Sequence, residues 1–175
     1  LLLGAIAQQT SRLESAVTYY KTILQLQPNH FEAHSNLAVA LQNWGDWQGA
    51  ENHFKRALEL NPTHSPTLFN LGNLRSQQSD LPGAIAYYQQ AIALNPSYAR
   101  AHNNLGNTFR AQGDLRQAAV HFRRAIELEP TNHATYNNLG NVLQEQGEFA
   151  AAVSLYQQAL AHQPDNAEFY FNQGN

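Results

Sequence analysis

One short segment recurs along the chain at a fixed spacing and constrains the fold more than any other feature. Residues 137–141 read Asn-Asn-Leu-Gly-Asn, as do residues 103–107, and residues 69–73 read Phe-Asn-Leu-Gly-Asn. A weaker copy, Ser-Asn-Leu-Ala-Val, occupies residues 35–39, and Phe-Asn-Gln-Gly-Asn occupies residues 171–175. Each copy lies 34 residues from the next, so the whole sequence has this period.

The prolines give the same period independently. Five of the seven are spaced by 34 residues: Pro28, Pro62, Pro96, Pro130 and Pro164. A repeat of about 20 to 50 residues is typical of solenoids, in which each unit packs only on its neighbours. The spacing therefore predicts an array of small units rather than a domain with one central core.

The residues between these markers resemble the tetratricopeptide repeat family. The family pattern places Leu-Gly, an aromatic residue, Ala, a second aromatic residue, Ala and Pro in order, and one unit fills it with Leu105, Gly106, Phe109, Ala118, Phe122, Ala125 and Pro130. The resemblance covers essentially the entire chain. It implies an all-α fold, a right-handed superhelical solenoid of antiparallel helix pairs, in which the first helix of each pair lines a concave surface that contacts extended peptides.

The period also sets the expected units of a single array over residues 1–175. Residues 31–64, 65–98, 99–132 and 133–166 are four complete repeats, whereas 1–30 and 167–175 are parts of repeats. Both ends fall inside a repeat and the sequence holds no Met, so we expect a fragment of a longer protein.

Each unit reads as two helices joined by a tight turn. In residues 99–112 the packing residues recur every three or four positions, Gly113 and Asp114 interrupt the pattern, and Pro130 ends the second helix. Small residues lie on the packing faces, among them Gly106 and Ala118, where a larger side chain would separate the helices. Glycine inside a helix costs up to about 1 kcal/mol relative to Ala, so we expect close helix contacts at these positions.

Composition argues against several classes of partner. The net charge is −3 and only two residues are Lys, whereas nucleic acids and anionic membranes attract clustered Lys and Arg. No stretch of about 20 apolar residues is present to span a membrane. The absence of Cys excludes disulfides and thiolate metal sites and favours a reducing, cytoplasmic compartment.

No set of residues predicts catalysis, a cofactor or a metal site. His30 and His34 have the spacing that puts two imidazoles on one helix face, but a zinc site needs further ligands and no HExxH pattern is present. His34 shares its repeat position with Leu68 and Tyr136, and we expect it to pack between helices. We therefore expect this chain not to be an enzyme.

The asparagines form the candidate binding site. At 100° per residue, the positions of Asn104 and Asn107 lie nearly opposite the packing face of their helix. Asparagine is a poor helix former, about 0.7 kcal/mol below Ala, so a run of them needs a compensating role. We call these residues the asparagine stripe: Asn36, Asn70, Asn73, Asn104, Asn107, Asn138, Asn141, Asn172 and Asn175.

Two roles for the stripe stay open. A carboxamide offers donors and an acceptor, and can pair with the backbone of a peptide without reading its side chains. Alternatively, these residues serve packing between neighbouring repeats. The stripe resembles the repeat region of O-linked N-acetylglucosamine transferases, which implies an asparagine-lined groove that holds protein substrates. Repeats that clamp a chaperone carboxylate use Lys and Arg in the groove, and here only Arg100 and Arg110 are candidates.

The sequence therefore predicts a scaffold that binds a protein or an extended peptide along a largely neutral groove. One alternative is the substrate-recognition arm of a larger enzyme, such as a glycosyltransferase similar to the O-linked N-acetylglucosamine transferases. Another is a self-assembling scaffold, because the open ends of a solenoid expose apolar faces that can stack end to end.

Overall fold

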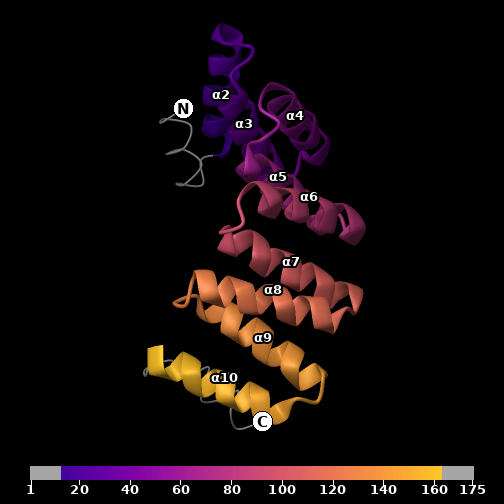
Figure 1. The fold of residues 1–175 in the computed structure, drawn as a ribbon. Coiled ribbons are helices and arrows are strands. Elements are labelled where there is room, and N and C mark those ends of the chain that lie inside the picture. The colour runs from indigo at the N-terminus through magenta and orange to yellow at the C-terminus, as the bar shows by residue number, and fades with distance from the viewer. Residues whose placement is uncertain (1–12, 163–175) are drawn as a thin grey trace. The chain divides into compact units, whose positions relative to one another are not determined.

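The computed structural model describes residues 13–162 (Figure 1). Within this range the chain forms helices and turns without a strand, which confirms the predicted all-α fold. The start of the predicted partial repeat 1–30 and all of the predicted partial repeat 167–175 lie outside the described residues. The chain divides into two compact units, Leu1–Asp80 and Leu81–Asn175.

Helices of the first unit follow the 34-residue period. They are α2 (Leu13–Leu26), α3 (Phe31–Trp44), α4 (Trp47–Leu60) and α5 (Ser65–Gln77). α3 and α4 are the two helices of repeat 31–64 and pack against each other, while α2 packs on α3 and α5 on α4. The buried side chains of this unit include Tyr20, Leu37, Phe54, Leu71 and Leu74.

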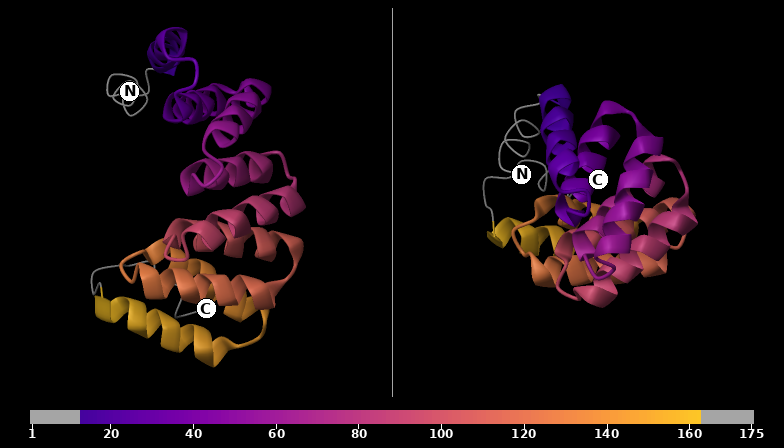
Figure 2. Two further views of the ribbon diagram at one scale, coloured as in Figure 1. Left: turned by 45° about the horizontal axis from the view of Figure 1, so that its top comes forward. Right: turned by 90° about the horizontal axis from the view of Figure 1, so that it is seen from above.

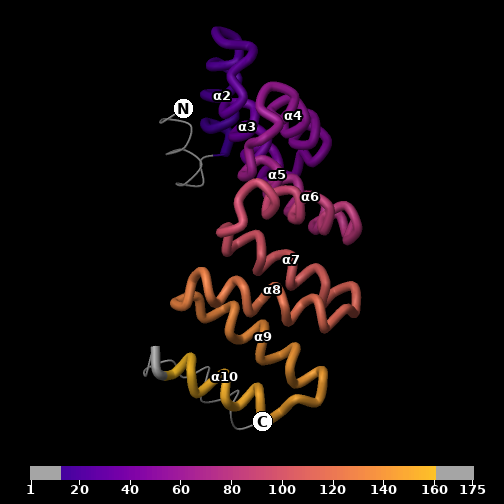
Figure 3. The backbone as a smooth tube through the Cα atoms, in the orientation of Figure 1, coloured from indigo at the N-terminus to yellow at the C-terminus, as the bar shows by residue number. Residues whose placement is uncertain are grey.

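The second unit contains five helices: α6 (Leu81–Leu94), α7 (Ala99–Gln112), α8 (Leu115–Leu128), α9 (His133–Glu145) and α10 (Phe149–His162). The chain reverses direction at each turn between α7, α8, α9 and α10, as the tube in Figure 3 shows. The left view of Figure 2 shows the same antiparallel succession of helices in this unit. Its core includes Phe122, Tyr136, Leu139, Val142 and Tyr156.

We call α3, α5, α7 and α9 first helices and α2, α4, α6, α8 and α10 second helices, after their order in a repeat. The tight turn between them has the same design in two repeats. Gly45 and Gly113 end α3 and α7 in the left-handed conformation, with φ of 91° and 87°. Asp46 and Asp114 then cap the next helix, each accepting a hydrogen bond from a backbone N–H three residues on.

Close packing at the small residues is confirmed. Ala118 is fully buried, and a Cβ atom added to Gly106 would lie 2.8 Å from the Cε1 atom of Phe122. A Cβ added to Gly140 would likewise meet the ring of Tyr156. The first helix thus lies directly against an aromatic ring of the second, which explains why a poor helix former occupies these positions.

Candidate functional site

The first helices of consecutive repeats lie side by side within each unit, α3 with α5 and α7 with α9. Hydrogen bonds join each pair near both ends. In the second unit, Thr135 donates to the Oδ1 atom of Asn103 (3.1 Å), and the Nε atom of Arg110 donates to Glu145 (2.9 Å). In the first unit the same repeat positions hold a Thr67–Ser35 bond (2.8 Å) and a Gln42–Gln77 bond (2.8 Å).

We call the side of α7 and α9 that carries the asparagine stripe the first-helix face. Its members are Arg100, Asn104, Asn107, Arg110, Asn138 and Asn141. Asn107 and Arg100 are exposed, whereas Asn104, Arg110, Asn138 and Asn141 are half-buried. The stripe is therefore partly enclosed by neighbouring side chains rather than projecting freely into solvent.

Two amides of this face bond to neighbouring elements. Asn138 donates from Nδ2 to the Oδ1 atom of Asn103 on α7 (3.3 Å). Asn104 bonds to the hydroxyl of Tyr88 on α6. Burial raises the pKa of that phenol to about 12, against the opposing effect of this hydrogen bond. These two contacts support the packing role, because each one joins residues of consecutive repeats.

Other amides of the stripe have no protein partner. Within residues 13–162, no hydrogen bond is made by the side chains of Asn107 and Asn141, which share a repeat position on α7 and α9. The same holds in the first unit for Asn36 on α3 and Asn70 on α5, both half-buried. Asn73 does have an interaction, and Asn172 and Asn175 lie outside the described residues.

The candidate groove cations have different surroundings. Arg110 is neutralised by Glu145 from the neighbouring first helix. Arg100 is exposed, and its charge lies near Tyr98 at the start of α7. The first-helix face of the second unit therefore carries one ion pair and one exposed guanidinium among neutral amides.

The fold, the turns and the repeated positions match known families. A model described as TPR repeat matches residues 72–109 and 106–147, and models described as tetratricopeptide repeat match residues 31–64, 133–166, 53–86 and 1–30. Together they cover residues 1–166 without a gap. The chain belongs to the tetratricopeptide repeat family.

Solved structures of tetratricopeptide arrays agree with this assignment. MamA is 25% identical, with a TM-score of 0.83 over 95% of this chain and 97% of that chain. PilF of Pseudomonas aeruginosa is 22% identical, with a TM-score of 0.86 over 98% of this chain and 78% of that one. YrrB, described as a TPR protein with an unusual peptide-binding site, is 20% identical, with a TM-score of 0.76 over 98% and 89%. At these identities PilF and YrrB show the fold alone.

No curated protein sequence matches the chain significantly. Membership of the tetratricopeptide repeat family makes the chain a repeat scaffold, as predicted, and such proteins are generally not enzymes. None of the helices between residues 13 and 162 has the length and apolar character needed to cross a bilayer. The resemblance to O-linked N-acetylglucosamine transferases stays a prediction.

The histidines that the sequence singled out as a pair have separate partners. His30 precedes α3, and its Nδ1 atom lies 3.8 Å from Glu32. His34 is buried and pairs instead with His53 of α4, with 2.9 Å between their Nδ1 atoms. Among the described residues of the tetratricopeptide array, no group of three or more potential metal ligands is present.

The same histidine pair occurs at the equivalent positions of the second unit. The Nε2 atom of His102 donates to the Pro96 carbonyl (3.2 Å), so its Nδ1 atom accepts from His121 (3.1 Å). Burial, and then the nearby His102, lower the pKa of His121 to about 4. Burial also lowers the pKa of His102 and of His53. The sequence predicted that His34 packs between helices but did not predict either histidine pair, for which the shared 19-residue spacing was the available signal.

A charged network in the first unit joins α4 to α5. Glu51 and Lys55 on α4 form an ion pair, with 2.7 Å between Lys55 Nζ and Glu51 Oε1. Arg75 of α5 joins the same carboxylate at 2.6 Å, and only 12% of the Glu51 side chain is exposed. Glu51 is therefore shielded from water by α5 rather than lying on a fully solvated face.

Proposed function

We propose that this chain is a protein-interaction scaffold whose first-helix face binds the backbone of an extended partner segment. The observation that carries this proposal is the pair of amides at Asn107 and Asn141. They occupy the same repeat position on adjacent first helices, and neither has a partner among the described residues.

The chemistry of these amides suits a peptide backbone. A carboxamide can donate to a carbonyl and accept from an N–H at the same time, so it can pair with main-chain groups whatever the side chains are. Each Asn lowers the helix propensity by about 0.7 kcal/mol relative to Ala. Asn104 and Asn138 offset this cost with bonds to neighbouring repeats, whereas Asn107 and Asn141 do not. A partner segment would supply the missing bonds.

The charges of the face argue for a neutral rather than an acidic ligand. Arg110 is already paired with Glu145, and the one exposed guanidinium of the face is that of Arg100, whose charge lies near Tyr98. Binding through neutral amides depends little on ionic strength, whereas recognition of carboxylates weakens with added salt. Binding at this face should therefore persist at high salt.

The likeness to YrrB, described as having an unusual peptide-binding site, lends support to a peptide ligand. In the alternative function, the array presents protein substrates to the catalytic domain of a larger protein. The same amides would then bind the backbone of the substrate. End-to-end self-association is a separate possibility, and light scattering over a range of concentrations tests it.

The experiment compares two double variants. Peptides are first selected from a displayed random library on the immobilised chain, and the tightest is titrated against each variant. Asn107→Ala with Asn141→Ala should weaken binding by roughly tenfold or more, for the loss of two ligand hydrogen bonds, while the melting temperature holds or rises. Asn104→Ala with Asn138→Ala should lower the melting temperature instead. Unchanged affinity in the first variant would refute the proposal.

A further inference from the structure

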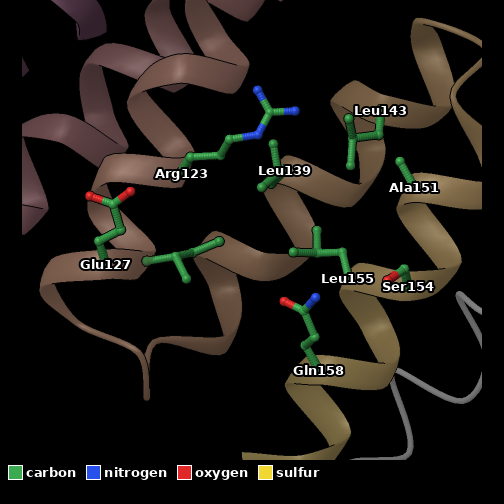
Figure 4. Close-up of a pocket in the computed structure, with 9 residues that line it drawn as sticks. Arg123, Glu127, Leu139, Leu143, Ala151, Ser154, Leu155 and Gln158 are labelled. Carbon is green, nitrogen blue, oxygen red and sulfur yellow. The ribbon is translucent and has the colours of Figure 1, made fainter.

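A pocket of about 380 Å³ opens between two second helices of the second unit. Side chains from α8, α9 and α10 converge on it, as Figure 4 shows. Leu139 and Leu143 of α9 form its apolar floor, and Ile126 of α8 and Leu155 of α10 form its walls. This volume falls at the lower end of the range for small-ligand sites, roughly 300 to 1,000 Å³, and is ample for one large apolar side chain.

The rim of this pocket holds one unpaired cation. Arg123 lines the pocket, and no hydrogen bond or ion pair engages its guanidinium within residues 13–162. Glu127, which also lines the pocket, is already bound by Arg124 at 2.8 Å. An anion placed over the apolar floor would therefore find a free guanidinium beside it.

The first unit contains a pocket at the equivalent positions, three repeats earlier. It measures about 350 Å³ and lies between α2, α3 and α4. Lys21 takes the place of Arg123, Leu24 that of Ile126, and Leu37 that of Leu139. Among its lining residues are a cation and no carboxylate. A cation beside leucine side chains thus recurs in two separate units, although His34 and His53 also line the pocket of the first unit.

We propose that the pocket of the second unit binds an aliphatic side chain that stands next to a carboxylate in an acidic segment of a protein partner. The aliphatic group occupies the floor formed by Leu139 and Leu143, and Arg123 holds the carboxylate at the rim. Arginine is suited to this because its planar guanidinium can bind both oxygens of a carboxylate. The pocket of the first unit would take the same motif more weakly, because Lys21 binds as a point charge.

This site is independent of the function proposed above. It uses side chains of α8 and α10 and the buried face of α9, none of which belongs to the first-helix face. Its ligand chemistry also differs, since it needs an acidic group and an apolar side chain rather than a bare backbone. A variant of either site can therefore fail without affecting the other.

The test uses a short fluorescein-labelled peptide of alternating Leu and Asp, with fluorescence anisotropy as the readout. Two matched peptides replace every Asp by Asn or every Leu by Ser. The Leu–Asp peptide should bind at low salt and lose affinity as salt rises. Both matched peptides should bind at least about tenfold more weakly. Equal binding of the Leu–Asn peptide, or no binding of the Leu–Asp peptide, would overturn the proposal.

Two exposed positions locate the binding without disturbing the core. Arg123→Gln should weaken the Leu–Asp peptide by about tenfold, whereas Arg116→Gln, an exposed arginine on the same helix outside the pocket, should not. Ala151→Phe should fill the pocket and weaken binding similarly, and Ala150→Phe is its control. If affinity falls instead in the Asn107→Ala, Asn141→Ala variant, the peptide occupies the first-helix face and the pocket proposal fails.

Discussion

The Nδ1 atoms of His102 and His121 lie 3.1 Å apart, and the equivalent atoms of His34 and His53 lie 2.9 Å apart. Each pair joins the first helix of a repeat to its second helix. The carbonyl oxygens of Pro96 and Pro28 accept from the other ring nitrogen of His102 and His34. The Nδ1 atom of each first-helix histidine must therefore accept, and the Nδ1 atom of its partner on the second helix donates.

Acid should destabilise the helix hairpins through these pairs. Burial lowers the pKa of His121 from its ordinary value near 6.5 to about 4, so the unfolded chain binds the proton more readily than the folded one. The stabilisation is complete above pH 6.5 and is lost as pH falls toward 4. Besides burial, the charge of Lys21 lowers the pKa of His53, and the charge of Arg124 lowers the pKa of His102. Asp46 has the opposite effect on the pKa of His53.

Melting temperatures measured from pH 7 to pH 5 check this expectation. The decrease should be smaller in His53→Leu and in His121→Leu, because Leu155 occupies the same repeat position and needs no proton partner. His30→Gln is the control, since His30 precedes α3 and belongs to neither pair. An identical decrease in wild type and in the His53→Leu, His121→Leu double variant would contradict the prediction.

Glu51→Gln should destabilise the first unit by about 1 to 3 kcal/mol. The substitution removes the carboxylate that binds Lys55 and Arg75, and only 22% of the Arg75 side chain is exposed to water. The hydrogen bond from Lys55, and the charges of Arg75 and Lys55, lower the pKa of Glu51 against the opposing effect of burial. This stabilisation is therefore present above the ordinary pKa of a glutamate and is lost below it.

Urea unfolding at neutral pH gives this value. Glu59→Gln removes an exposed carboxylate paired with Arg56 on the same helix, and it should change stability by less than about 0.5 kcal/mol. Equal effects of the two substitutions would show that α5 does not shield Glu51.

Ala118→Leu should cost on the order of 1 to 3 kcal/mol by overpacking the contact between α7 and α8. Ala118 is fully buried in this hairpin, whereas Ala111 on α7 is exposed. Ala111→Leu should therefore leave the melting temperature nearly unchanged. A stable Ala118→Leu protein would mean that the two helices are not in close contact there.

Stoichiometric zinc should be absent from protein purified without a histidine tag. His34 uses both ring nitrogens in hydrogen bonds, to His53 and to the Pro28 carbonyl, so a metal ion would have to displace them. Elemental analysis decides the question. One equivalent of bound zinc would contradict this prediction and indicate a metal site at His30 and His34.

Much of the fold could be predicted because its determinants are local. The pattern of residues 99–112 ends at Gly113, which takes the left-handed conformation that Gly adopts without strain, and α7 has these same bounds. The contacts that the sequence missed lie between helices. The ion pair of Glu51 with Lys55, one turn away, is local to α4, but Arg75 comes from the next repeat and its contact depends on how α5 packs on α4.

The candidate site could be predicted less well for the same reason. Helix geometry places Asn104 and Asn107 on one face. It does not show that Asn104 bonds to Tyr88 while Asn107 has no partner among the described residues. Nor does it show the pocket beside Arg123, which needs three helices to form. A comparison at twice the period would have helped, since His34, His53, Lys55 and Arg56 recur as His102, His121, Arg123 and Arg124.

The hydrogen bonds between neighbouring first helices also differ from one junction to the next, so they depend on the order of the repeats. One junction joins Gln42 to Gln77, and the equivalent junction joins Arg110 to Glu145. Exchanging repeats 31–64 and 99–132 would set Gln42 against Glu145 and Arg110 against Gln77, which leaves each charge without its counterion. Shuffled arrays of these modules would thus assemble with mismatched junctions, although every repeat in them kept its own fold.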